Sequence, residues 1–212
     1  YTMARNRLGK SDLFRLEMAN TALNCRQFEK AIREYMAYTE SNPVYLFFTN
    51  NQLKTILQEE PSLISVVSAI ADSSKSSVLK ELYANALVNM KDYQTALSIY
   101  KQLDPQKMWR FAEDQTAAGN NSIAFEAYSY LENIETDQVK KMDLLFRLAE
   151  IKYQQRDYSG SEQIISGCLS MPFWKDRNLY YRSNVSVKLR KLMAEIMLAK
   201  NEPVDSALVW LN

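Results

Sequence analysis

The chain has 212 residues, of which 47% are hydrophobic and 24% are charged, so it can bury an apolar core and is not disordered by composition. Its net charge of +1, from 26 basic and 25 acidic residues, lacks the strongly basic balance of most nucleic-acid binders, and no nucleic-acid partner is expected. The sequence has no histidine, which removes the commonest general base and metal ligand, and no apolar run long enough to span a membrane.

Glycine and proline are scarce, with 4 and 5 residues, and this scarcity favours helix over strand. The first helical pair is expected over residues 12–43. In "FRLEMANTALNC" and "FEKAIREYMAYTESNP", large apolar residues recur at i, i+3 or i+4, and i+7, as on one face of a helix. The polar joint Arg26-Gln27 separates the two segments. Ala19 in the first segment and Ala31 in the second are small residues at which the two helices could cross closely.

A divergent pair is predicted over residues 45–73, where Pro61 opens its second half, "PSLISVVSAIADS". Residues 77–105 then repeat the pattern of the first pair. The small residues here are Ala84 and Ala96, and the stretch "KDYQTALSIYKQLDP" places Tyr93 and Tyr100 as packing aromatics.

Two further pairs are predicted over residues 107–136 and 141–172. The first carries its small and aromatic residues at Ala112, Gly119, Ala124 and Tyr128, and the second at Ala149, Tyr158 and Ser161. An irregular connection over residues 173–186 is followed by an incomplete pair over residues 187–212, with Ala207 in its second helix.

These units resemble tetratricopeptide repeats (TPR), which are helix pairs of about 34 residues with small residues and aromatics at fixed places. The resemblance implies an all-α, right-handed α-solenoid that forms a single domain over residues 1–212. The tryptophan that the family carries at repeat position 4 is absent. Four other residues stand there: Arg15, Lys80, Met108 and Leu145. The repeat spacing is also irregular, so we expect a less regular superhelix than in a consensus array.

The resemblance further implies a non-catalytic protein-protein interaction scaffold that binds a partner peptide or protein segment on its concave face. Asparagine amides can donate to and accept from an extended backbone, and aromatic residues are enriched among binding anchors. The positions that would line this groove are Asn20, Asn24, Asn85, Asn89, Trp109, Glu113, Phe146, Glu150 and Tyr153. The alternatives to a binding role are that the asparagines are solvated surface residues and that Trp109 belongs to the core.

Other interpretations of the function remain open at this stage. The chain could be a bacterial envelope assembly factor or lipoprotein-type TPR protein, or a regulatory subunit of an enzyme complex. We expect no enzymatic activity, cofactor or metal, because no phosphate loop, nucleophile motif or metal set appears. The carboxylate pairs Glu59-Glu60 and Glu113-Asp114 are equally consistent with solvated charge. Cytoplasmic and bacterial periplasmic locations are both compatible with the sequence, and self-association is a further option.

Cys25 and Cys168 match no metal-binding spacing and lie in the first and fifth units, so we predict that they are not bonded to each other. The stretch 172–191, with Trp174 and Tyr181 among basic residues, is the least repeat-like. It is interpreted as an ordered connection. A second binding site, for nucleic acid or an acidic partner, is the alternative.

Overall fold

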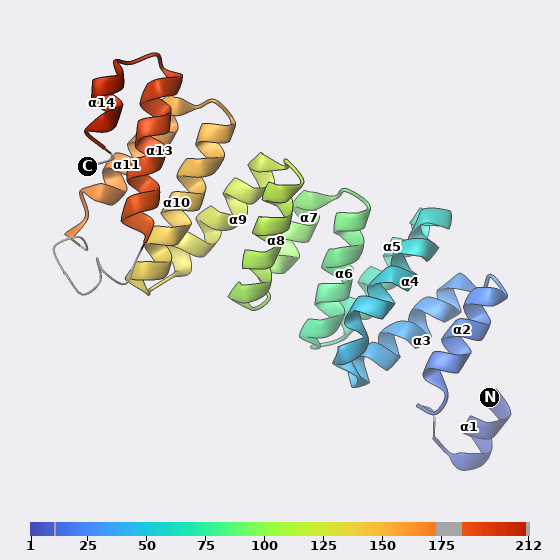
Figure 1. The fold of residues 1–212 in the computed structure, drawn as a ribbon. Coiled ribbons are helices and arrows are strands. Elements are labelled where there is room, and N and C mark those ends of the chain that lie inside the picture. The colour runs from blue at the N-terminus through green and yellow to red at the C-terminus, as the bar shows by residue number, and fades with distance from the viewer. Residues whose placement is uncertain (11, 173–183, 211–212) are drawn as a thin grey trace. The chain divides into compact units, whose positions relative to one another are not determined.

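The computed structural model describes residues 1–10, 12–172 and 184–210 (Figure 1). The chain divides into two compact units, Tyr1–Asp104 and Pro105–Asn212, each described here by itself. The described residues form helices and their connections, with no strand among them. The predicted all-α class is therefore confirmed, while the solenoid and the single domain stay predictions. No helix in these described ranges is both long and apolar enough to cross a membrane.

In unit 1 (residues 1–104), α2 packs against α3 and α6 packs against α7, while α4 and α5 each pack against both α3 and α6. Two short 3₁₀ turns, η1 (Pro43–Tyr45) and η2 (Pro61–Leu63), begin with proline, whose fixed φ suits a first helical turn. The α-helices of this unit are α1 (Thr2–Leu8), α2 (Arg15–Asn24), α3 (Phe28–Ser41), α4 (Leu46–Glu59), α5 (Ile64–Ser73), α6 (Ser77–Asn89) and α7 (Tyr93–Tyr100).

Unit 2 (residues 105–212) also consists of neighbouring helix pairs: α8 with α9, α10 with α11, and α13 with α14. The sequence-predicted connection 173–186 lies mostly outside the described residues, as do Trp174 and Tyr181, and α13 already begins at Val185. The bounds are α8 (Pro105–Ala117), α9 (Asn121–Ile134), α10 (Gln138–Gln154), α11 (Tyr158–Leu169), α13 (Val185–Ala199) and α14 (Val204–Leu208).

Eight of the small residues predicted in the helix pairs are fully buried, whereas Gly119 is exposed. In the pair α10/α11, the Ser161 hydroxyl donates a 2.7 Å hydrogen bond to the carbonyl of Ala149, so these two helices touch at that point. Backbones can approach this closely only where the side chains are small. The residues with 0% exposure are Ala19, Ala31, Ala84, Ala96, Ala112, Ala124, Ala149 and Ser161.

The joints between paired helices share one backbone geometry. In α2/α3, Arg26 has a φ of 57°, its N–H donates to the carbonyl of Leu23, and the N–H of Gln27 donates to the carbonyl of Ala22. This is the Schellman motif, which satisfies carbonyls left open at a helix end. Within the described residues the motif recurs at joints whose left-handed residues are Lys91, Gly119, Arg156 and Asn201.

Among these joints only the one at Gly119 uses glycine. This position can test how much a left-handed backbone costs when a Cβ is present. Gly119 has a φ of 77°, and nothing lies within 4 Å of where a Cβ would be added. Gly119→Ala should therefore lower the free energy of unfolding by about 1 kcal/mol through left-handed strain alone. The measurement is urea denaturation followed by circular dichroism.

The matched control for this substitution is Gly167→Ala, within α11, where an added Cβ also meets nothing and φ is ordinary for a helix. That variant should gain about 0.5–1 kcal/mol, because alanine loses less backbone entropy in a helix than glycine. Equal shifts in the same direction for both variants would contradict the assignment of strain to the joint.

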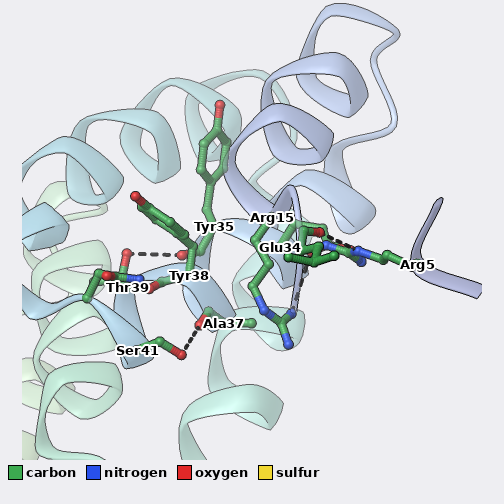
Figure 2. Close-up of polar contacts among 10 residues, drawn as sticks. Arg5, Arg15, Glu34, Tyr35, Ala37, Tyr38, Thr39 and Ser41 are labelled. Carbon is green, nitrogen blue, oxygen red and sulfur yellow. Dashed lines mark hydrogen bonds and ion pairs between the residues drawn. The ribbon is translucent and has the colours of Figure 1, made fainter. Parts of the chain in front are cut away.

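Arg5 joins the first helix to α3 by polar contacts. The Arg5 guanidinium donates two hydrogen bonds to the Glu34 carboxylate on α3, at 2.7 and 3.0 Å, and a third to the carbonyl of Leu13 at 2.6 Å. Figure 2 shows Arg15 approaching the same carboxylate, at 3.6 Å. The bond to Glu34 raises the pKa of Arg5 above its usual value. Meanwhile Met3 of α1 is 76% exposed.

Candidate functional site

The residues predicted to line one binding groove fall in both compact units. Asn20 and Asn24 lie on α2, and Asn85 and Asn89 on α6, all in unit 1. The remaining five belong to unit 2: Trp109 and Glu113 on α8, and Phe146, Glu150 and Tyr153 on α10. Each set is therefore considered within its own unit.

The two inner asparagines of unit 1 make the same contact. The Tyr35 hydroxyl on α3 donates to Oδ1 of Asn20 at 2.6 Å, and the Tyr100 hydroxyl on α7 donates to Oδ1 of Asn85 at 2.6 Å. Both bonds join residues fifteen apart and tie the second helix of a pair to its first. The similar sequences of the helix pairs α2/α3 and α6/α7 thus form the same hydrogen bond.

This hydrogen bond gives Asn20 and Asn85 a structural role that the sequence analysis did not predict. Tyr35 is fully buried, and burial raises the pKa of its phenol, so the hydroxyl stays protonated and able to donate. One turn further along each helix, Asn24 and Asn89 are exposed. The signal for the contact was present in the sequence as the recurring fifteen-residue spacing of asparagine and tyrosine.

In unit 2, glutamates occupy the corresponding places on the first helices, and one arginine joins them. Arg147 on α10 lies 3.4 Å from Glu150 on the same helix and 4.0 Å from Glu113 on α8. The structure therefore brings Glu113 and Glu150 to a common cation, which offsets part of their combined charge. Arg147 was not singled out by the sequence analysis, although its place three residues before Glu150 permits a pair within one helix.

An open groove of about 970 Å³ lies among the helices of unit 2 and includes Trp109 and Glu113. Its wall combines apolar side chains with charged ones of both signs. The lining comes from α8, the end of α9, the start of α10 and the start of α13: Pro105, Gln106, Trp109, Arg110, Glu113, Leu131, Ile134, Glu135, Val139, Lys140, Asp143, Leu144, Asn184 and Val185.

Trp109 is half-buried and packs edge to face on Tyr128 of α9, with ring centroids 5.6 Å apart and an interplanar angle of 78°. Tyr128 is 1% exposed, and burial is the largest cause that raises the pKa of its phenol. The indole therefore rests on a rigid base and still borders the groove. Both alternatives raised from the sequence, core residue and groove residue, describe part of its environment.

Phe146 and Tyr153 are not among the residues that line this groove. Both are half-buried and pack against the apolar cluster that α10, α11 and α13 form. The Lys188 ammonium lies 5.4 Å from the ring centroid of Phe146, and the ring of Tyr153 is 5.7 Å from that of Tyr158. These contacts account for both aromatic rings by packing within unit 2.

No group of three or more potential metal ligands occurs in the part of the chain that the structure describes. Of the carboxylate pairs considered from sequence, Glu59 forms an ion pair with Arg26 and Glu113 pairs with Arg147. A scan against protein-family models finds no match, and a search of curated proteins finds none either.

Proposed function

We propose that this chain is a non-catalytic binding module of the tetratricopeptide type, and that the groove of unit 2 holds a peptide segment of another protein. The observation that carries this proposal is the groove itself, an open space of about 970 Å³ with Trp109 on its wall. Peptide sites commonly combine apolar surface for anchors with a few polar groups that set orientation.

Three features support the repeat-type interpretation. The small residues at the helix crossings are fully buried, the Schellman joints recur, and the hydrogen bond of Tyr35 with Asn20 is repeated by Tyr100 with Asn85. Identical joints and identical inter-helix contacts are expected when each pair of helices solves the same packing problem as its neighbours.

Trp109 is the residue expected to contribute most to binding. Its indole is large, half-buried and fixed by Tyr128, so it loses little conformational entropy when a peptide covers it. In this proposal, an apolar side chain of the peptide packs on the indole, with Ile134 and Val139 beside it on the groove wall. Ile134 is 46% exposed, which leaves apolar surface for the peptide to cover.

The test starts from peptides selected against the full chain from a phage library of random sequences. Each selected peptide, labelled with fluorescein, is titrated by anisotropy against wild type and Trp109→Ala. The affinity should fall about thirtyfold, since a buried aromatic anchor is worth about 2 kcal/mol.

The matched control is Phe125→Ala, another half-buried aromatic in unit 2, whose ring lies 5.2 Å from the Lys152 ammonium and outside the groove lining. That variant should bind like wild type. The proposal fails if no peptide is selected, if Trp109→Ala binds like wild type, or if Phe125→Ala loses as much affinity as Trp109→Ala.

A further inference from the structure

The carboxylates of the unit 2 groove are already engaged by cations. Glu113 lies 4.0 Å from a guanidinium nitrogen of Arg147, and Asp143 lies 3.5 Å from the ammonium of Lys188. Neither Arg147 nor Lys188 is itself among the residues that line the groove. Each of these two carboxylates therefore already has a cation near it, although Arg147 is shared with Glu150.

The third carboxylate of the lining is engaged as well, by backbone. Oε1 of Glu135 accepts hydrogen bonds from the N–H groups of Thr136 and Asp137, each at 2.8 Å. By contrast, the two cations of the lining, Arg110 and Lys140, are exposed and have no ion-pair or hydrogen-bond partner for their side chains among the described residues. The groove thus offers two cations without a partner, whereas each of its carboxylates already has a contact.

This asymmetry selects among possible occupants. A basic segment would place its charges beside Arg110 and Lys140 and would have to compete with Arg147 and Lys188 for the carboxylates. An acidic segment meets two cations that have no partner to give up. Because apolar residues such as Trp109, Ile134 and Val139 also line the groove, the same segment should bring apolar side chains as well.

We infer that the occupant of this groove is an acidic, apolar peptide segment of another protein, whose carboxylates pair with Arg110 and Lys140 while an apolar side chain packs on Trp109. This inference rests on the proposed peptide-binding function and specifies its ligand. The net charge of +1 leaves the specificity to these local groups rather than to the field of the whole chain.

The experiment uses peptides selected against the full chain, as above, and compares each with a version in which Asp and Glu are replaced by Asn and Gln. The selected pool should be enriched in Asp and Glu. Removing the carboxylates should weaken binding about tenfold at low salt, and this difference should shrink as salt screens the charges. A pool without acidic enrichment, or amide versions that bind equally well, would overturn the inference.

The protein variant for this test is Arg110→Glu/Lys140→Glu, and its control is Lys54→Glu/Lys75→Glu, which changes the net charge equally at exposed sites in unit 1. Only the groove variant should lose the acidic peptides. Circular dichroism melting confirms that both variants are folded. If the two variants weaken binding equally, the effect is one of net charge and the inference is wrong.

The same design separates this inference from the proposed function. If Trp109→Ala weakens peptide binding but Arg110→Glu/Lys140→Glu does not, the inference is wrong and the proposed peptide-binding function stands. If Trp109→Ala binds the peptides like wild type, both are wrong. A concentration-dependent dimer that Trp109→Ala abolishes would instead identify a second copy of the chain as the occupant. Tight binding of a uridine-only RNA oligonucleotide, lost in the Arg110→Glu/Lys140→Glu variant, would identify a nucleic acid. Either result overturns the assignment to an acidic peptide.

Discussion

Replacing Ala96 with leucine is expected to lower the free energy of unfolding by about 1–3 kcal/mol, the usual cost of overpacking a core. Ala96 lies on α7 with 0% exposure, and its predicted counterpart on α6, Ala84, is also fully buried. The added methylenes have no space to enter, so the two helices must separate. Since α6 also packs against α4 and α5, the loss should be felt beyond α7.

The comparison that isolates overpacking is Ala117→Leu, the same chemical change at an exposed position on α8. This variant should unfold within about 0.5 kcal/mol of wild type, as most surface substitutions do. Both variants are measured by urea denaturation at equilibrium. An Ala96→Leu protein as stable as wild type would show that the crossing of α6 and α7 is looser than the burial indicates.

Thiol labelling of the folded protein is expected to modify Cys25 rapidly and to leave Cys168 intact. Both cysteines are free, as predicted from their places in the sequence, but Cys25 is exposed and Cys168 is buried. Burial raises the pKa of the Cys168 thiol to about 12, and its sulfur lies 3.2 Å from that of Met142. At pH 8, only roughly one Cys168 thiol in ten thousand would be in the reactive thiolate form.

The measurement is titration with a chromogenic disulfide reagent, first on the folded protein and then in denaturant. One thiol should react within minutes in the folded state, and the second only after unfolding, with a rate difference of at least a thousandfold. Cys25→Ser, a change at an exposed site, should abolish the fast phase. Two fast thiols in the native protein would mean that the core around α11 opens readily.

Helical class and the crossing positions were predictable because they depend on local periodicity. Ala19, Ala84 and Ala149 stand where the apolar faces of paired helices must meet, and such positions are visible in a linear pattern. Charged partners were less predictable, since an ion pair between helices depends on their rotation and crossing. The contact of Arg147 with Glu113, across α8 and α10, is such a case.

The candidate site was recoverable only in part for the same reason. Trp109 and Glu113 were singled out from their repeat positions, and both line the groove of unit 2. Arg110 and Lys140 also line it, but the repeat pattern does not distinguish them from other surface residues. Phe146 was predicted for the same surface; it is half-buried against the cluster of α10, α11 and α13, and its place in a binding site stays a prediction. Repeat position identifies a helix face, whereas neighbouring side chains decide which part of that face stays open.

The attachment of α1 differs in kind from the packing that holds the helix pairs of unit 1. The helix pairs are held by buried apolar area, which temperature and denaturant weaken. α1 is joined to α3 through the ion pair of Arg5 and Glu34, whose side chains are only 12% and 13% exposed. Salt screens such largely buried pairs much less than exposed ones. Loss of either side chain would instead leave the other as a mostly buried charge without this partner, so the attachment of α1 depends on both residues together.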